Sequence, residues 1–269
     1  MPELPEVETV RQTLKQFILG EEILGVDIYY DKIIDGDSDE FVRLLTHQTF
    51  RDIDRLGKYL IFICDDVAFV SHLRMEGKYH ILDKNQEINK HTHVVFHLKD
   101  KELCYIDTRK FGRMKIVDKD NYCYSLPLSK LGKEPFDISV DELYQRFHQT
   151  SLPVKTALLD QSIVCGIGNI YANEICFLMN IDPRTPASRL SKKRVQELID
   201  ISIDVLNRAI VQGGTTIHSF DANGIHGLFQ VQLNVHGQKV CPVCQGTIKK
   251  ITVHQRGTYY CPCCQKKRY

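Results

Sequence analysis

The chain has 269 residues, of which 43% are hydrophobic and 26% are charged, and its formal net charge at pH 7 is +1. This length accommodates two domains and a small additional module. No apolar run is long enough for a membrane-spanning helix, and there is no internal repeat or low-complexity segment. We therefore expect a protein with no membrane partner.

The N-terminus begins Met-Pro-Glu, and an initiator methionine is usually removed before a small residue. Pro2 would then carry a secondary amine, and α-amino groups titrate near pH 8, so about a tenth is an uncharged nucleophile at pH 7. Glu3 and Glu6 are close enough in sequence to manage protons for it. The plain alternative is that Pro2 and Pro5 only begin a helix.

Residues 5–19 carry an apolar stripe with helical spacing, and Gly20 is suited to the helix C-cap. Residues 22–118 consist mostly of short β-type runs between polar turns, which predicts a two-layer β-sandwich or barrel. The clearest runs are Val26–Tyr30, Tyr59–Cys64, Val67–His72, His93–Leu98, Leu103–Ile106 and Arg113–Val117.

The composition changes near residues 131–135, which predicts a linker. Helical spacing dominates from there to about residue 212 and is broken by the glycine-rich turn 165–168. Residues 191–212 form a long amphipathic pattern closed by two glycines. Residues 215–230 lack periodicity and are predicted to form a mobile loop.

Two Cys-x-x-Cys pairs lie near the other end, Cys241 with Cys244 and Cys261 with Cys264. This spacing predicts one structural zinc ion held by four thiolates on two tight turns. Two disulfides are the alternative, disfavoured because no secretory signal precedes the chain. Cys263 is not excluded as a ligand by register. The other five cysteines are expected to be reduced thiols of a cytosolic protein.

Charge is distributed unevenly along the chain. Residues 231–269 contain seven Lys or Arg and no Asp or Glu, whereas the other 230 residues have 28 basic and 34 acidic groups, a net charge of −6. One zinc ion with four thiolates would leave the tail at about +5. A basic zinc ribbon on a mildly acidic body is typical of a phosphate-binding surface, although a solvated tail has the same composition.

Taken together, these motifs resemble the formamidopyrimidine-DNA glycosylase family of bacterial base-excision repair, within the Fpg/Nei superfamily. The resemblance runs from end to end. It rests on PELPEVETV at 2–10, GKYL at 57–60, HLRMEGKY at 72–79, DTRKFGR at 107–113, KTALLDQ at 155–161, GIGNIYANE at 166–174, GGTTI at 213–217 and the four-cysteine ribbon.

The resemblance implies an α+β multidomain fold. An N-terminal helix plus β-sandwich would form the catalytic domain at 1–131. A helical domain with a helix–two-turn–helix element would occupy 132–230, including a lesion-covering loop at 213–230. The zinc-finger DNA-binding module would occupy 231–269. A monomer in the bacterial cytosol or nucleoid is expected, with damaged double-stranded DNA as its partner.

The implied activity is that of a bifunctional glycosylase and abasic-site lyase that removes 8-oxoguanine and formamidopyrimidines. Pro2 would attack C1′ and form a Schiff base, and β,δ-elimination would follow. Glu3 would move the proton for sugar-ring opening, with support from Glu6, and Lys58 would bind phosphate near the nucleophile.

Attack at C1′ requires the damaged nucleotide to leave the base stack. Met75, Arg109 and Phe111 match the family residues that fill the resulting gap and hold the unpaired base. Lys110 and Thr108 depart from commoner family residues beside them. The remaining residues expected to contact DNA are His93, Lys155, Asn169 and Arg256.

Three alternatives remain at this level. An endonuclease VIII-like enzyme for oxidised pyrimidines would share the nucleophile. A zinc-ribbon protein that only binds DNA would not need Pro2 or Glu3. A tautomerase-like enzyme would use the N-terminal proline as a base, but the ribbon would have no role in it.

Overall fold

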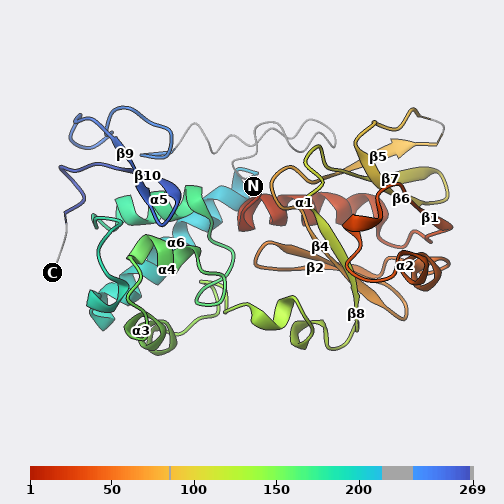
Figure 1. The fold of residues 1–269 in the computed structure, drawn as a ribbon, viewed down its shortest axis with the longest axis horizontal. Coiled ribbons are helices and arrows are strands. Elements are labelled where there is room, and N and C mark those ends of the chain that lie inside the picture. The colour runs from red at the N-terminus through yellow and green to blue at the C-terminus, as the bar shows by residue number, and fades with distance from the viewer. Residues whose placement is uncertain (85, 214–232, 267–269) are drawn as a thin grey trace. The chain divides into compact units, whose positions relative to one another are not determined.

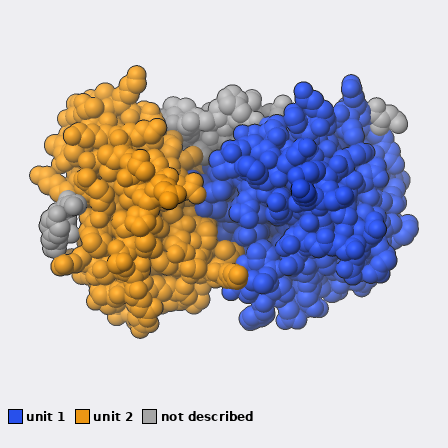
Figure 2. Space-filling view, in the orientation of Figure 1, with its two compact units in different colours: residues 1–129, 213–227 blue, residues 130–212, 228–269 orange. Residues whose placement is uncertain are grey.

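The computed structural model describes residues 1–84, 86–213 and 233–266 (Figure 1). Within this part, the chain divides into two compact units (Figure 2). Unit 1 contains Met1–Ser129, and unit 2 contains Lys130–Gln212 together with residues from 233 onward. The expected lesion-covering loop at 213–230 lies, except for Gly213, outside the described residues.

Unit 1 is built on two four-stranded antiparallel sheets, ordered β1-β6-β7-β5 and β2-β3-β4-β8. Aromatic rings join the two sheets: Phe69 of one stacks on Phe96 of the other, with centroids 5.4 Å apart. The predicted two-layer sandwich is therefore confirmed. The strands are β1 Gly25–Ile28, β2 Asp52–Leu56, β3 Tyr59–Ile63, β4 Ala68–His72, β5 Lys78–Asp83, β6 Thr92–His97, β7 Lys101–Ile106 and β8 Arg113–Val117.

Two helices accompany these sheets, α1 at Leu4–Ile18 and α2 at Ser38–Leu45. The apolar stripe of α1 contributes buried side chains to the sandwich core, as its spacing predicted. Asp37 is the N-cap of α2, and its carboxylate accepts the Glu40 backbone N–H at 2.8 Å. Helix α1 is thus packed on the sandwich core through Val7, Val10, Leu14 and Ile18.

Strand β2 was not predicted from the sequence because three of its five residues, Asp52, Asp54 and Arg55, are charged. Only Ile53 among its five residues is fully buried. Arg55 pairs with Glu8 of α1 at 2.9 Å, and Asp52 pairs with Lys15 of the same helix at 2.5 Å. Two of the charges of β2 are therefore paired with α1, and the third, Asp54, accepts the Tyr122 hydroxyl at 2.6 Å.

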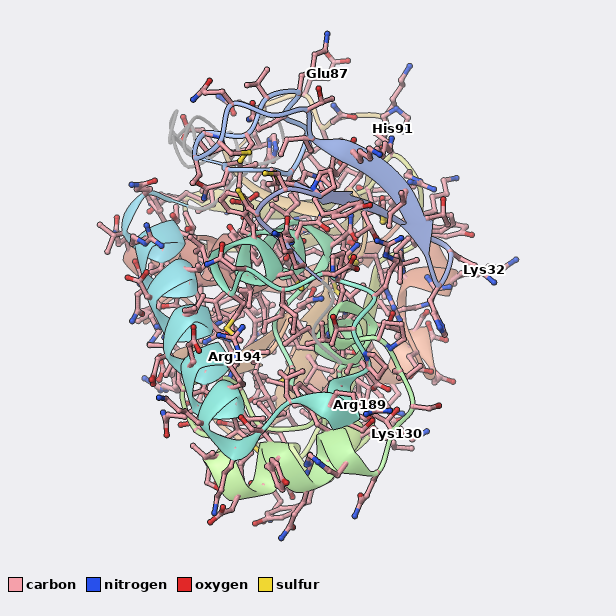
Figure 3. All side chains as sticks on the ribbon, turned by 90° about the vertical axis from the view of Figure 1, so that its left-hand side faces the viewer. Lys32, Glu87, His91, Lys130, Arg189 and Arg194 are labelled. Carbon is pink, nitrogen blue, oxygen red and sulfur yellow. The ribbon has the colours of Figure 1, made fainter. Side chains whose placement is uncertain are left out.

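Unit 2 contains four α-helices among the described residues, α3 Val140–His148, α4 Val154–Leu159, α5 Asn169–Leu178 and α6 Lys192–Val211. Ser191 caps α6, and Arg194 in its first turn donates to the Met179 carbonyl at 2.6 Å. Arg189 and Lys130 point outward from this unit (Figure 3). None of the described helices has the length and apolar character needed to cross a membrane.

The β9–β10 hairpin completes unit 2, with β9 at Lys249–Val253 and β10 at Arg256–Tyr260. Val253 pairs with Arg256, so the loop consists of two residues, His254 and Gln255. Both have positive φ angles, 42° and 62°, as a tight two-residue hairpin turn requires. This geometry places Arg256 at the first position after the turn.

Candidate functional site

The first turn of α1 is organised by two nearly buried carboxylates. Glu3 is the extended N-cap residue, and its backbone N–H donates to Glu6 Oε2 at 2.7 Å, as in a capping box. Their side chains are only 2% and 3% exposed. Pro2, which is half-buried, comes directly before them. Two carboxylates are thus fixed beside the nitrogen that removal of Met1 would free.

Lys58 lies in the tight turn between β2 and β3 and is 5% exposed. The preceding Gly57 has a φ of +57°, and its carbonyl accepts Arg55 Nη1 at 3.1 Å. Arg55 also donates to Glu8 of α1. Burial opposes the ionised form of Glu8, but hydrogen bonds from Arg11 and Arg55 hold the pKa of its carboxyl below the usual value. The Lys58 turn is therefore tied to the helix that carries Glu3.

Asp107 organises the loop that carries Arg109 and Phe111. Its fully buried carboxylate accepts three backbone N–H groups, from Arg109 at 2.9 Å, Phe111 at 2.9 Å and Gly112 at 2.8 Å. The Arg109 guanidinium lies 4.8 Å from the centroid of the Phe111 ring, which is 48% exposed. The loop presents a cation and an aromatic ring to solvent on a rigid base.

Met75 lies on a second turn of unit 1 and is 39% exposed. The turn closes where the Gly77 N–H donates to the Leu73 carbonyl at 2.9 Å. His72 Nδ1 accepts the Arg74 N–H at 2.9 Å. Burial, followed by the positive charges of Arg74 and Lys58, lowers the pKa of His72 to about 3, so its ring is neutral.

His93, for which a DNA contact is expected, is buried in the structure. It is 4% exposed, and its Nε2–H donates to the Asp107 carbonyl at 2.7 Å. Lys155, for which a DNA contact is also expected, is buried as well. It is 1% exposed, and its ammonium donates to Asn169 Oδ1 at 2.8 Å, Thr258 Oγ1 at 2.7 Å and the Gly257 carbonyl at 3.1 Å. Both side chains are turned inward because buried acceptors surround their donors.

Lys155 joins the two residues expected to bind phosphate. Its partner Asn169 is the first residue of α5, where helix N–H groups lack intrahelical acceptors. Because Asn169 Oδ1 accepts from Lys155, the Nδ2 donor of the amide points elsewhere. Gly257 and Thr258 follow Arg256 in β10, and Arg256 itself is exposed. One buried ammonium thus fixes both elements.

The turn between α4 and α5 depends on Gln161. Its amide donates to the Leu159 and Ile167 carbonyls at 2.9 and 3.0 Å, and its carbonyl accepts the Gly166 N–H at 3.0 Å. Gly166 has a φ of +96°, which favours glycine at this position. The Gln161 side chain therefore sets the start of α5 and, with it, Asn169.

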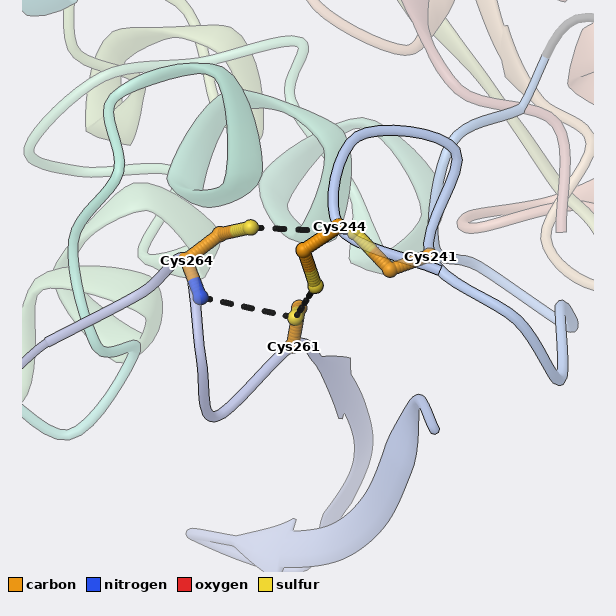
Figure 4. A group of neighbouring side chains, drawn as sticks. All are labelled: Cys241, Cys244, Cys261 and Cys264. Atoms are coloured by element: carbon orange, nitrogen blue, oxygen red, sulfur yellow. Dashed lines mark hydrogen bonds between the residues drawn. The ribbon is translucent and has the colours of Figure 1, made fainter. Parts of the chain in front are cut away.

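The four predicted zinc ligands come together in unit 2 (Figure 4). All four sulfurs lie within 4.8 Å of one another, with Cys244 and Cys261 Sγ 3.5 Å apart and Cys241 and Cys264 Sγ 3.8 Å apart. Tetrahedral zinc with bonds of about 2.3 Å requires S···S separations of about 3.8 Å. The residues fit one zinc ion. Cys263, by contrast, is exposed and is not part of this group.

Three residues with a positioning role were missed in the sequence analysis. Asp107, Gln161 and Glu174 all lie inside the quoted motifs, but the bonds of their side chains to backbone groups have no sequence signal. Glu174 of α5 is 2% exposed and accepts the backbone N–H groups of Asn234, Val235 and His236 at 2.7 to 3.0 Å. A charged residue within the apolar helix 169–178 was the one clue to its burial.

Three segments of the chain match known domain families. Residues 1–114 match the formamidopyrimidine-DNA glycosylase N-terminal domain. Residues 131–221 match the formamidopyrimidine-DNA glycosylase H2TH domain. Residues 238–267 match a zinc finger found in FPG and IleRS. The segments follow one another in the order expected from the motifs.

Curated relatives match over the whole length. The formamidopyrimidine-DNA glycosylase of Oceanobacillus iheyensis is 44% identical, covering 100% of this chain and 99% of the relative. The enzyme of the same name from Bacillus licheniformis is 45% identical, covering 99% of this chain and 100% of the relative. A Lactococcus lactis FPG mutant bound to Fapy-dG containing DNA has a TM-score of 0.94 at 36% identity, covering 99% and 100%. The chain therefore belongs to the formamidopyrimidine-DNA glycosylase family.

Proposed function

We propose that this protein removes oxidised purines, 8-oxoguanine and formamidopyrimidines, from duplex DNA through a covalent intermediate on the Pro2 nitrogen. Family membership establishes the coarser activity: the protein is a DNA glycosylase of base excision repair that acts on damaged DNA, and lyase activity is part of the family. Solved relatives are bound to Fapy-dG containing DNA and to abasic-site DNA. The lesion class and the residue roles below are our proposal.

The observation that carries the proposal is the pair of buried carboxylates at the start of α1. Once Met1 is removed, the Pro2 amine attacks C1′, the base departs, and nitrogen and sugar form an iminium. A secondary amine keeps that positive charge without protonation, so the iminium accepts electrons during β- and δ-elimination. Glu3 moves the proton for opening of the sugar ring. Glu6 accepts the Glu3 backbone N–H and thereby holds Glu3 in place.

Base removal also requires the damaged nucleotide to leave the stack. Met75 and Phe111 are exposed apolar side chains on two braced turns, which suits wedges that fill the gap. The Arg109 guanidinium offers two parallel N–H donors to the O2 and N3 acceptors of an unpaired cytosine. A good bidentate contact is worth about 1–3 kcal/mol of base discrimination, so cytosine is preferred over adenine opposite the lesion.

Phosphate binding falls to Asn169 at the start of α5 and to Arg256 after the hairpin turn, with Lys58 near the nucleophile. Lys155 and His93 act as positioning residues, because their donors are satisfied inside the protein. When bound, zinc supplies the cross-link that holds the finger in its fold. The four cysteines would hold it, and the finger carries Arg256.

We further propose a monomer that acts in the bacterial cytosol, with functional modules at 1–131, 132–230 and 231–269. The end of unit 1 at Ser129 supports the first boundary. Light scattering of the purified protein with and without a short duplex tests the stoichiometry. A mass equal to two chains per duplex would contradict the monomer.

Borohydride trapping on a duplex with one 8-oxoguanine tests the central proposal, because borohydride reduces an iminium to a stable amine. Protein that begins at Pro2 should form a covalent complex, whereas protein that retains Met1 should bind but not trap. Glu3→Gln should bind the duplex and trap slowly. Full trapping with Met1 attached would refute the role of Pro2. Faster excision of thymine glycol than of 8-oxoguanine would favour oxidised pyrimidines as the substrate.

A further inference from the structure

The hydroxyl of Tyr105 lies between the two turns that carry Met75 and Phe111. Tyr105 is near the end of β7 and is fully buried. A Cβ atom added to Gly77, at the end of the Met75 turn, would lie 2.3 Å from this hydroxyl, and one added to Gly112 would lie 1.6 Å from it. Any side chain larger than hydrogen at Gly77 or Gly112 would therefore collide with the phenol.

A second contact joins the same two turns at the surface, where the Thr108 hydroxyl donates to the Glu76 carboxylate. Within each turn the backbone is already braced, by Asp107 in one and by the bond from Gly77 to Leu73 in the other. The separation of the two turns therefore depends on the contacts between them. The internal contact is the Tyr105 hydroxyl, and close-packed interiors resist compression at such points.

We propose that Tyr105 is a positioning residue that sets the spacing between Met75 and Phe111, and thereby how both side chains enter a damaged duplex. This inference rests on the insertion role proposed above for those two side chains. A phenol suits the task because its ring is rigid and its length is fixed. Burial and the neighbouring Asp107 carboxylate raise the pKa of Tyr105, so the hydroxyl stays neutral.

Tyr79 provides a matched control. It is also fully buried and is paired with Tyr105 across strands β5 and β7, with ring centroids 5.3 Å apart. Its hydroxyl donates to Ser71 Oγ at 2.8 Å. Tyr79→Phe therefore removes a buried hydroxyl from the same core without removing the contact with Gly77 and Gly112.

The experiment measures single-turnover excision of 8-oxoguanine, the fluorescence of 2-aminopurine placed beside the lesion, and binding to undamaged duplex. Tyr105→Phe should lower excision and the fluorescence change by at least about threefold, as expected for a contact that couples neighbouring groups. Binding to undamaged duplex should stay at the wild-type level. Tyr79→Phe should leave all three readouts unchanged. Thermal melting confirms that each variant is folded.

Double substitutions separate positioning from general damage to the core. Gly112→Ala should impair excision more than Tyr105→Leu does, and the double variant should recover to the level of Tyr105→Leu alone, because the hydroxyl and ring atoms that the added Cβ would meet are then gone. Gly77→Ala should not be rescued by the same change. Its Cβ would also meet the Leu73 carbonyl oxygen at 2.5 Å.

Failure of Tyr105→Leu to rescue Gly112→Ala would overturn the inference, as would an equal loss of binding to undamaged duplex in Tyr105→Phe. Met75→Ala and Phe111→Ala separate this failure from failure of the proposed function. If they reduce excision while the Tyr105 variants do not, only the inference fails. If they too leave excision unchanged, the insertion role itself is wrong.

Discussion

Replacing Asp107 by Asn should impair lesion excision without weakening non-specific DNA binding. The carboxylate accepts two backbone N–H groups on Oδ2 and one on Oδ1. Asparagine keeps one oxygen, so its best orientation retains the bonds to Phe111 and Gly112 and turns an NH₂ group toward the Arg109 N–H. One buried donor is then unpaired, and the other two bonds lose their charge assistance. Together these losses cost about 2–4 kcal/mol.

The assay is single-turnover excision of 8-oxoguanine beside titration of an undamaged duplex. A cost of this size in the loop should reduce excision at least about tenfold, since 1.4 kcal/mol corresponds to a factor of ten. Asp118→Asn is the matched control, because Asp118 also accepts two backbone N–H groups, at 2.8 Å each, but on an exposed turn. Wild-type excision by Asp107→Asn would refute the idea that this carboxylate organises the loop.

Three further outcomes follow from the structure. Chelation of zinc, or Cys244→Ser, should unfold the finger and weaken DNA binding while trapping at Pro2 persists; active protein free of zinc would contradict this. Arg256→Ala should lower the salt dependence of binding by about one phosphate contact, and an unchanged slope would contradict that. The pKa of His72 is about 3 when folded, against 6.5 otherwise. The neutral His72 ring therefore contributes fully to the free energy of unfolding above pH 6.5, and this contribution is lost as the pH falls toward 3, by up to about 1.4 kcal/mol per pH unit. His72→Gln should reduce this slope, which denaturant unfolding at several pH values measures.

Patterns that depend on local spacing were predictable, and those that depend on distant partners were not. Helix α1 begins and ends within one residue of the prediction, and the four zinc ligands were named from their spacing. Strand β2 was missed because the partners of its charged residues Arg55 and Asp52, which are Glu8 and Lys15, are far away in the sequence. No sequence pattern shows whether a lysine side chain is exposed to solvent or buried. Lys155 is buried because its ammonium donates to three internal acceptors.

The hydrogen bonds that Glu174 accepts have a consequence for which changes in chain length the protein tolerates. One carboxylate binds the backbone of residues 234–236, immediately before the zinc finger, and ties it to α5. Phe177 of this helix also packs in one apolar cluster with Val235 and with Ile248 of the finger. The position of the finger on α5 is thus determined by contacts of residues 234 and beyond. Insertions or deletions between α6 and this point need not disturb the place of the finger on α5.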